Sequence, residues 1–492
     1  MAVPAIHKEQ LVADLKRLGL QPGDIVLVHS SLSSIGRVEG GADAVIEALL
    51  EVLGPSGTLA FPSFHWVQPY DPNLPSKMGV ISERFRTWPG VVRGVHATHP
   101  VNAIGPQAEA LLKDHLKSPT SCGPETPFGR LIEFGGKILL LGVDNDRNTT
   151  MHTVEQIVEA PYLSDRDATY LDTKGKVQTI RLKLNPGPHR DFIGLDPALR
   201  RSGAQVMGKV GNAVARLIDA RKMHDLMLEG FQYDPALVLC DNPNCADCVE
   251  QRRWIRLARL REESFTLSAL ASAVSTYPDE IAVELNRSGI SDLVLDRLYG
   301  QPAWAVPEAR LRRAADTFAA EGIALGAIYA RPDEAAFARD LSLAQSLGAS
   351  AVIVPFPPDL RPFLDAAAAQ KVSVFFENVS FGSTVCLRLL EAAGAGAVVV
   401  FNPAAFVLAG EKPFLGIVNH GPFRRYIGAL YLSDATFAGA YTPLARGNGE
   451  VKELLSVLRC RSFSGRVVVA TGPGGPAFRE LVDEFWAMMD AS

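Results

Sequence analysis

The sequence predicts an α/β protein with two domains: an α/β domain over residues 1–252 and a (β/α)₈ TIM barrel over residues 264–492. Three observations support this fold class. Short apolar runs alternate with helical patterns along the chain, and the second half repeats that alternation eight times in about 225 residues, the size of such a barrel. The charged stretch "EQRRWIRLARLREES" (250–264) separates the two halves.

The first domain begins with an amphipathic helical pattern, "MAVPAIHKEQLVADLKRLGL", whose charges are unlike those of a signal peptide. Strands are predicted at "DIVLVHSSL", "GTLAFPSF" and "GGKILLLGV", and a helix at "GADAVIEALLEVLG". Past residue 166, "ATYLDTKGKVQTIRLKLN" predicts a small antiparallel insertion. A return to helix is predicted from "VGNAVARLIDARKMHDLMLEGF" onwards.

In the second domain, continuous apolar runs are typical of strands that helices cover on one face and the barrel interior covers on the other. Between them lie helical segments such as "PEARLRRAADTFAAEG" and "EAAFARDLSLAQSLGA". The strands are expected at "FTLSALA", "SDLVLDRL", "IALGAIYA", "SAVIVPF", "VSVFFEN", "AGAVVVFN", "LYLSDA" and "RVVVATG".

Composition excludes several classes of function. The 492 residues are 47% hydrophobic and 21% charged, with a net charge of −5, and both signs are mixed along the chain. This favours small-molecule substrates and indicates neither nucleic-acid nor membrane partners. No apolar stretch approaches the roughly 20 residues of a membrane span. The six sparse cysteines predict a reduced, cytoplasmic enzyme, and a homo-oligomer remains one option for its assembly.

The segment "RNTTMHTVEQ" (147–156) follows a predicted buried strand and opens a helix. It places His152 and Glu155 one turn apart on the same helical face, where the carboxylate can accept a proton from one ring nitrogen. The other nitrogen then stays basic, which is the arrangement of a general base. A single histidine at a helix start is more often structural, so the neighbouring motifs must decide.

Three further stretches contain polar groups at predicted strand and helix ends. "HSSLSSIGRVEGG" (29–41) suits a polar or anionic ligand, although on its own such a stretch is more often a capped strand-to-helix turn. "RGVHATHPVNAIGP" (93–106) contributes His96 and His99 as candidate substrate contacts. Asp144 and Asp146, in "VDNDRN", would hold a cationic acceptor, or else belong to a solvated loop.

These stretches, with "GPETPFGRL" and "GGKILLLG", occur in the order found in the aminoglycoside 3-N-acetyltransferases, and the chain resembles that family over roughly residues 8–250. The resemblance implies the family's own α/β fold and acetyl-CoA as donor. It implies a loop for the pantetheine and phosphates of CoA, formed by Ser30, Ser31, Leu32, Ser33, Gly36 and Val38. It places Thr126, Pro127 and Phe128 along the thioester channel, and Thr149, His152 and Glu155 in a T-x-x-H-x-x-E motif.

The family's usual His-Pro-x-His-Ser is His-Ala-Thr-His-Pro here (96–100), so the geometry of that loop is left open. The implied activity is antibiotic resistance by acetylation of an aminoglycoside, or acetylation of a related amino sugar in natural-product biosynthesis. His152 would deprotonate the acceptor amine, Glu155 would orient the imidazole, and Thr149 would donate to the thioester oxygen. The alternatives are another acyl thioester as donor, and Cys122 as a nucleophile.

"CDNPNCADC" brings Cys240, Cys245 and Cys248 together at a C-x₄-C-x₂-C spacing. With His224 they could hold zinc, but a second ligand pair is missing. We therefore expect no metal, and zinc at these cysteines is the alternative.

The second domain resembles the xylose-isomerase-like barrels, whose strand ends hold a divalent metal. Glu377 occupies one ligand position, but Asn402, Tyr431 and either Ala470 or Thr471 stand at the others. One carboxylate is a poor site for a divalent ion, so we predict a metal-free barrel in which Tyr431 and Asn402 donate to Glu377. A sugar isomerase or epimerase and a non-catalytic binding or dimerisation module are the alternatives.

Overall fold

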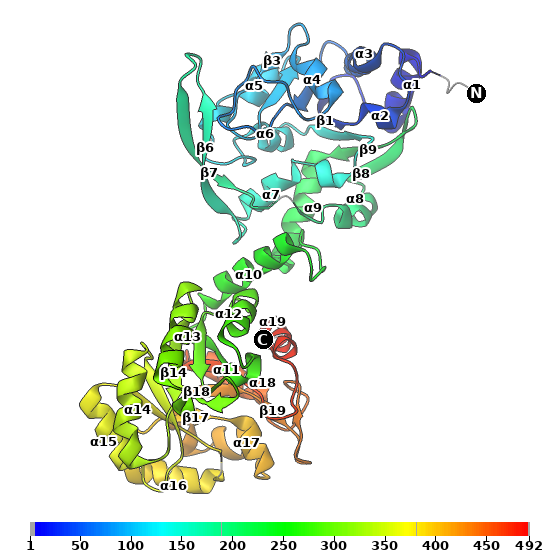
Figure 1. Ribbon diagram of the computed structural model, residues 1–492. Coiled ribbons are helices and arrows are strands. Elements are labelled where there is room, and N and C mark those ends of the chain that lie inside the picture. Colours follow the sequence, from blue (N-terminus) through cyan, green and yellow to red (C-terminus); the bar gives the residue numbers. More distant parts are fainter. Residues whose placement is uncertain (1–4, 188, 380, 491–492) are drawn as a thin grey trace. The chain divides into compact units, whose positions relative to one another are not determined.

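The computed structural model describes residues 5–187, 189–379 and 381–490 (Figure 1). The chain divides into two compact units, Met1–Ile255 and Arg256–Ser492. The helix α10 (Ala246–Leu260) contains the division. No helix among the described residues is long and apolar enough to span a membrane.

A mixed sheet forms the centre of the first unit, with strand order β3-β4-β2-β1-β5-β9-β8 over the described residues. β1 pairs in parallel with β2 and β5, and the outer strands pair antiparallel. The bounds are β1 Ile25–Ser30, β2 Thr58–Pro62, β3 Val92–Arg93, β4 Val101–Ile104, β5 Lys137–Leu141, β8 Gln205–Val210 and β9 Ala213–Asp219.

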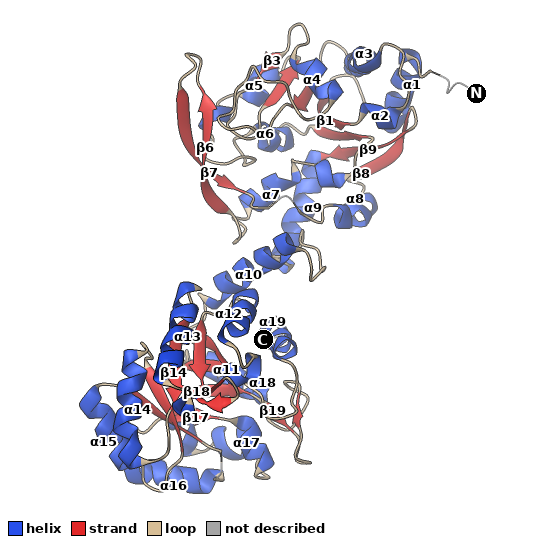
Figure 2. Ribbon diagram, in the orientation of Figure 1, coloured by secondary structure: helices blue, strands red, loops and turns tan. Residues whose placement is uncertain are grey.

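Both faces of this sheet are buried, which explains why its central strands are continuous apolar runs (Figure 2). On β5, Ile138 and Leu140 join the core beneath α6, α7 and α9, whereas Leu139 and Leu141 join the core beneath α1 and α3. The helices are α1 Lys8–Leu18, α2 Leu32–Ile35, α3 Gly41–Leu53, α4 Val80–Arg86, α5 Ala108–Leu112, α6 Pro127–Glu133, α7 Met151–Ile157, α8 Asp196–Arg201 and α9 Ala220–Tyr233.

The antiparallel insertion is a separate hairpin of β6 (Ser164–Leu171) and β7 (Val177–Leu184), at one side of the first unit in Figure 1. Gln68 fastens it by accepting hydrogen bonds from the backbone N–H and hydroxyl of Thr169, at 2.8 and 3.0 Å. The end of the hairpin at Leu184 lies beside α7, where Gln156 donates to the Lys183 carbonyl at 3.2 Å.

The prediction of helix from residue 210 was wrong for its first part, because residues 213–219 form strand β9 and α9 begins only at Ala220. Burial alternates along β9, with Ala213 and Ala215 inside and Val214 exposed. A turn at Gly211, whose φ is +57°, joins β8 to β9. Pairing with β5 then outweighs the helical preference of "AVARL".

The second unit contains a closed barrel of parallel strands in the order β10-β11-β14-β15-β16-β17-β18-β21, as described. Seven of the eight fall within the runs predicted as strands, and the eighth, β18, begins three residues before the predicted run "LYLSDA" (430–435). The predicted fold class is confirmed. Their bounds are β10 Thr266–Leu270, β11 Asp292–Leu295, β14 Ala324–Tyr329, β15 Ala351–Pro355, β16 Ser373–Glu377, β17 Val399–Phe401, β18 Ile427–Leu432 and β21 Arg466–Val469.

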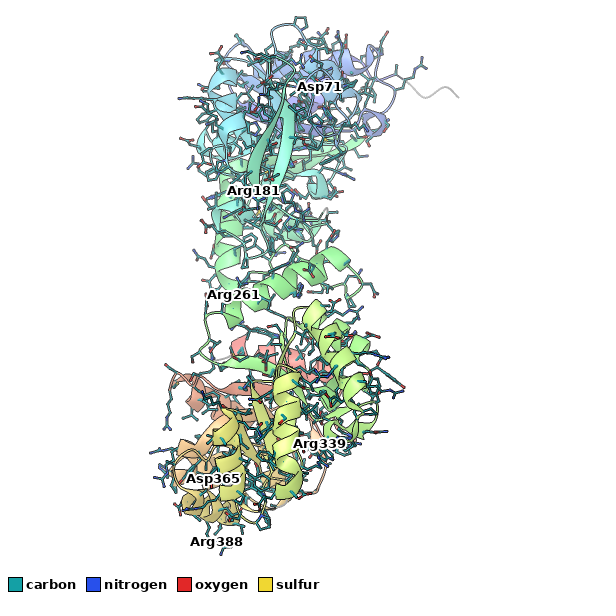
Figure 3. All side chains as sticks on the ribbon, turned by 60° about the vertical axis from the view of Figure 1, so that its left-hand side comes forward. Asp71, Arg181, Arg261, Arg339, Asp365 and Arg388 are labelled. Carbon is teal, nitrogen blue, oxygen red and sulfur yellow. The ribbon has the colours of Figure 1, made fainter. Side chains whose placement is uncertain are left out.

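Helices cover the outside of the barrel and turn charged side chains to solvent, such as Arg339, Asp365 and Arg388 (Figure 3). Small two-stranded ribbons, β12 (Arg297–Leu298) with β13 (Gln301–Pro302) and β19 (Asp434–Ala435) with β20 (Tyr441–Thr442), lie in its loops. The helices are α11 Ala271–Val274, α12 Pro278–Ser288, α13 Glu308–Ala320, α14 Glu334–Ser346, α15 Arg361–Gln370, α16 Ser383–Ala393, α17 Pro403–Leu408, α18 Val451–Arg459 and α19 Phe478–Asp490.

Candidate active site

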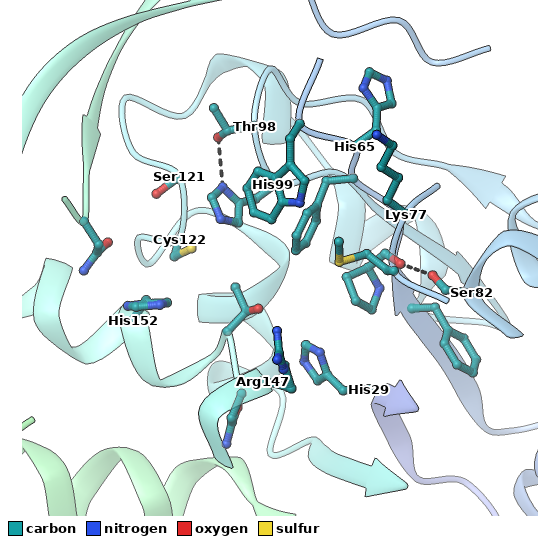
Figure 4. Close-up of a pocket in the computed structure, with 18 of the residues that line it drawn as sticks. His29, His65, Lys77, Ser82, Thr98, His99, Ser121, Cys122, Arg147 and His152 are labelled. Atoms are coloured by element: carbon teal, nitrogen blue, oxygen red, sulfur yellow. Dashed lines mark hydrogen bonds between the residues drawn. The ribbon is translucent and has the colours of Figure 1, made fainter. Parts of the chain in front are cut away.

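A cavity of about 810 Å³ opens at the carboxyl ends of the parallel strands β1, β2 and β5. This is the edge at which α/β sheets usually bind ligands, because the loops that leave parallel strands meet there. The cavity combines an aromatic wall with polar groups from five loops (Figure 4). Its polar lining includes His29, Ser30, His65, Gln68, Lys77, Thr98, His99, Asp146, Arg147, Thr149, His152 and Asn185.

α7 brings the predicted base and its partner together. His152 lies in its first turn and Glu155 three residues later, so both side chains lie on one face of the helix. Their contact joins His152 Nδ1 to Glu155 Oε2 at 2.5 Å. Because a carboxylate can only accept, Nδ1 is the protonated nitrogen, and Nε2 is left as the basic atom.

Glu155 is fully buried, and its second oxygen is held by Arg190. Arg190 Nε donates to Glu155 Oε1 at 2.6 Å, and its guanidinium also lies over the ring of Tyr162. Burial alone would raise the pKa of Glu155, but His152 and Arg190 outweigh it and lower that pKa. Glu155 is therefore a carboxylate at neutral pH, which keeps the imidazole of His152 in one tautomer.

His152 is partly exposed, at 23% of its side chain, and lines the cavity (Figure 4). The edge-on ring of Phe192, 4.9 Å away between centroids, fixes the plane of the imidazole. Thr149 lines the same cavity one turn earlier in the chain, and its carbonyl accepts from the His152 backbone N–H at 3.1 Å. The structure thus brings together the three residues of the predicted T-x-x-H-x-x-E motif.

The two histidines of residues 96–100 have different surroundings. His96 is fully buried and stacks on His115, and its Nδ1 accepts from the backbone N–H groups of Thr98 and His99 at 3.2 and 3.0 Å. His96 therefore shapes the loop and does not line the cavity. His99 does line it, and burial, with smaller contributions from His96 and His152, lowers the pKa of His99 to about 3. His99 is a neutral wall residue.

Among the residues predicted to hold CoA at the end of β1, Ser30 lines the cavity. The hydroxyls of Ser31 and Ser33 lie 3.1 Å apart at the start of the short helix α2, while Val38 forms a bridge with Ile6. Gly36 has a φ of +108°, a conformation that residues with a side chain rarely adopt, and it lies against the side chain of Asn212. These last residues form the turn itself and are not part of the cavity wall.

Thr126, Pro127 and Phe128 are not at the cavity surface, where the family resemblance placed them. All three are buried, and Phe128 belongs to the core beneath the sheet. Thr126 and Pro127 begin α6, as a proline at the first helical turn does without loss of a hydrogen bond. Their position is explained by helix initiation and core packing.

The two acidic residues after β5 have partners within the protein. Asp144 accepts from Arg216 Nη2 at 2.6 Å and from the Asn145 backbone N–H at 2.7 Å, and it does not line the cavity. Asp146 does line the cavity, and it pairs with Arg147 at 3.2 Å. Of these two acidic residues, Asp146 is therefore the one that a cationic acceptor in the cavity would contact.

Sequence reasoning missed several cavity residues, among them His29, His65, Lys77 and Arg147. Burial lowers the pKa of His29 to about 4, so this ring is neutral as well. His29 ends a strand in "HSSL" and Arg147 begins "RNTTMH", so the motifs already contained both residues. His65 and Lys77 lie in a long loop with no motif that signals them.

Cys122 lines the cavity but is itself buried. Burial raises the pKa of its thiol to about 12, so the sulfur stays protonated at neutral pH. A protonated thiol is a poor nucleophile.

The three cysteines of the "CDNPNCADC" tail do lie together, but the histidine beside them is His189 and not His224. His224 instead pairs with the adjacent Asp225 at 2.8 Å. The sequence could not select His189, because 51 residues separate it from Cys240.

At the barrel mouth, Glu377 forms part of a buried polar network. Tyr329 donates to Glu377 Oε2 at 2.7 Å, and Asn402 donates to Oε1 at 3.1 Å. Tyr431, expected to donate directly, instead lies 2.6 Å from the Tyr329 hydroxyl. Tyr329 was not anticipated, because a tyrosine in an apolar run gives no signal of its partner. The metal-free barrel stays a prediction.

Comparison with known proteins places the first unit in a family. Residues 27–232 match the family described as aminoglycoside 3-N-acetyltransferase. Aminoglycoside N(3)-acetyltransferase IV from Salmonella is 37% identical over 47% of this chain and 90% of that protein. The aminoglycoside N(3')-acetyltransferase-like protein YokD from Bacillus subtilis is 32% identical over 46% and 92%. The crystal structure of aminoglycoside acetyltransferase AAC(3)-IVa, apoenzyme, has 36% identity and a TM-score of 0.48 over 51% of this chain and 98% of that one.

The relatives from Salmonella and Bacillus subtilis are covered over almost their whole length at more than 30% identity. The resemblance that the ordered motifs indicated is thereby confirmed for the first unit. Through that unit, the chain belongs to the aminoglycoside 3-N-acetyltransferase family.

Proposed function

We propose that the first unit transfers the acetyl group of acetyl-CoA to an amino group of an aminoglycoside or a related amino sugar. The observation that carries the proposal is the His152–Glu155 pair at the wall of the 810 Å³ cavity. Family membership supports the same reaction, because the relatives are named for acetyl transfer to aminoglycosides.

The acceptor amine needs a base because its reference pKa lies near 10 and it is mostly protonated at neutral pH. His152 Nε2 accepts that proton, while the Glu155 carboxylate holds Nδ1–H and stabilises the imidazolium that forms. Arg190 keeps Glu155 charged and correctly oriented. General-base catalysis of this kind is commonly worth about 10² to 10⁴ in rate.

The cavity lining fits acetyl-CoA as the donor substrate. Lys77 and Arg147 supply positive charge suited to phosphate groups, and the aromatic residues Phe64 and Trp66 supply an apolar wall. Ser30 and Thr149 lie on the cavity surface as hydroxyl donors. In this assignment Thr149 donates to the thioester oxygen as negative charge develops there.

The reaction balances without a further reactant. The deprotonated amine nitrogen bonds to the acetyl carbonyl carbon, and the bond from that carbon to the CoA sulfur breaks. The proton held on His152 Nε2 then passes to the departing thiolate, and the nitrogen releases its second proton to solvent as the amide forms. The products are an amide and free CoA, and no acyl-enzyme forms.

The test uses the purified full chain, acetyl-CoA, and a panel of aminoglycosides and simpler amino sugars. We expect release of CoA thiol to match a mass gain of one acetyl group on at least one aminoglycoside. Fragmentation of that product identifies the modified amine. Consumption of a different acyl-CoA, with no acetyl product from any amine, would overturn the proposed donor.

The Cys122→Ala variant is expected to turn over at close to the parent kcat, because a thiol with a pKa near 12 is not ionised at working pH. Steady-state kinetics on the folded variant measures this. Intact-protein mass spectrometry of the parent, mixed with acetyl-CoA alone, provides the second readout. A loss of activity together with an acetyl group trapped on Cys122 would establish the cysteine mechanism instead.

For the barrel we propose a role without a catalytic metal, which the Tyr329 and Asn402 hydrogen bonds to Glu377 support. Glu377→Gln is therefore expected to change neither acetyl transfer nor the metal content of the purified chain. Elemental analysis of parent and variant measures the second quantity. A divalent ion that is stoichiometric in the parent and absent from Glu377→Gln would show that the barrel is a metalloenzyme.

A further inference from the structure

Four potential metal ligands meet at one point of the first unit, and none of them belongs to the cavity lining: His189, Cys240, Cys245 and Cys248. Their ligand atoms all lie within 4.8 Å of one another. They come from two distant segments, the loop after β7 and the segment that leads into α10. Such convergence of three sulfurs and one imidazole has no role in the acetyl-transfer mechanism.

The spacing of these atoms matches the edges of a tetrahedral zinc site. With Zn–N near 2.0–2.1 Å and Zn–S near 2.3 Å, the nitrogen–sulfur edge of a tetrahedron is about 3.5 Å. The distances from His189 Nδ1 are 3.3 Å to Cys248 Sγ, 3.4 Å to Cys245 Sγ and 4.0 Å to Cys240 Sγ, which bracket that value.

Hydrogen bonding alone does not account for the arrangement. One imidazole Nδ1–H can donate to one sulfur at full strength, yet three sulfurs surround the same nitrogen. A disulfide would use two of the three cysteines and leave the third, and all are free thiols. An ion at the centre uses all four groups at once.

The chemistry of the ligands selects zinc. Three thiolates and a neutral imidazole form one of the closed four-ligand sets of structural zinc sites, and soft sulfur ligands disfavour magnesium and calcium. Cys245 directly precedes α10 and Cys248 lies in its first turn, where the helix dipole favours negative charge. We propose that His189, Cys240, Cys245 and Cys248 bind one zinc ion, which ties the loop after β7 to the start of α10.

This site would also stabilise the backbone around Arg190, the residue that holds Glu155 of the His152–Glu155 pair. His189 is the neighbour of Arg190, whose Nη1 donates to the His189 carbonyl at 2.7 Å and whose Nη2 donates to the Pro186 carbonyl at 3.2 Å. The same guanidinium holds Glu155 through Nε at 2.6 Å. The zinc is thus a structural ion that fixes the backbone around a positioning residue, and its four protein ligands leave no position for substrate.

Neighbouring contacts already hold the two segments in register. Asp247 accepts from the His189 backbone N–H at 3.1 Å, and Gln251 donates to the Pro186 carbonyl at 3.1 Å. Both residues lie on α10, between and just after the cysteine ligands. These contacts hold the backbone of the His189 loop against α10, next to the candidate ligands.

The first test is elemental analysis of the full chain after extensive dialysis against metal-free buffer. We expect about one zinc per chain in the parent, no zinc in Cys245→Ser, and full zinc in the matched control Cys460→Ser, which replaces an exposed cysteine of the second unit. Zinc that remains in Cys245→Ser, or a parent without stoichiometric zinc, would overturn the proposal.

The second test needs no variant, so it holds even where Cys245→Ser fails to fold. The parent chain produced with cobalt in place of zinc should show the visible absorption of tetrahedral cobalt and the near-ultraviolet charge transfer of cobalt–thiolate bonds. A spectrum of octahedral cobalt without thiolate charge transfer would contradict the site. Neither readout depends on acetyl transfer, so failure of the proposed function would leave the metal result unaffected.

Discussion

The His152→Ala variant is expected to have a kcat at least about 100-fold below that of the parent, with little change in the affinity for CoA. The reason is that His152 is proposed to remove a proton in the transition state, whereas binding of CoA in the ground state requires no proton transfer. Loss of a group that acts only in the transition state lowers kcat and kcat/KM together. Steady-state kinetics with the best acceptor, and CoA binding by calorimetry, measure the two quantities.

The pH profile separates loss of a base from loss of structure. Deprotonation of the amine by solvent becomes easier as pH rises towards the pKa of the amine, so the deficit of His152→Ala should shrink at alkaline pH. His420→Ala, which removes an exposed histidine of the second unit, is the matched control and should keep the parent rate. A His152→Ala variant that turns over at near-normal rate would remove His152 from the mechanism.

The strands were predictable from the sequence wherever both of their faces are buried. "KILLL" in the first unit and "VVVF" in the barrel are continuous apolar runs. Successive side chains of each strand point to opposite faces, and each face packs against its own apolar core. Short outer strands were not predictable in the same way. β4 contains a polar Asn102, and β9 reads as helix because alanine, arginine and leucine favour helices, so only pairing with a neighbouring strand decides their state.

In the candidate site, too, contacts set by local geometry were predictable and contacts between distant segments were not. His152 and Glu155 were found because helical geometry alone brings residues three apart into contact. Arg190 lies 35 residues beyond Glu155, so its pairing depends on how the hairpin returns to α7. Thr126 and Phe128 show the opposite limit: a motif was recognised, yet the structure places its members at the start of α6 and in the core, outside the cavity lining.

Arg190→Met is expected to destabilise the first unit by about 3–5 kcal/mol, the usual cost of removing one partner from a buried ion pair. The side chains of Arg190 and Glu155 are 1% and 0% exposed, so the substitution leaves a carboxylate without its charge partner and without solvent. Only the hydrogen bond from His152 to Glu155 Oε2 then remains of the two contacts described above. The variant also loses the hydrogen bonds to the His189 and Pro186 carbonyls. Methionine keeps much of the side-chain volume, so the loss is chiefly electrostatic. Chemical denaturation, followed through the transition that coincides with loss of acetyl transfer, measures it.

The dependence on pH provides the decisive control for this prediction. The folded state lowers the pKa of Glu155, so the stability gained from its charge is complete above the unfolded pKa of about 4.3 and is lost as pH falls through the folded value. In Arg190→Met, burial favours the protonated carboxyl, which needs no cation. The destabilisation should therefore be largest near neutral pH and smaller in acid.

Arg181→Met, which breaks the exposed pair with Asp167, should cost less than about 1 kcal/mol at any pH. Equal destabilisation of Arg190→Met at neutral and acidic pH would show that packing, and not the charge of Glu155, makes Arg190 essential.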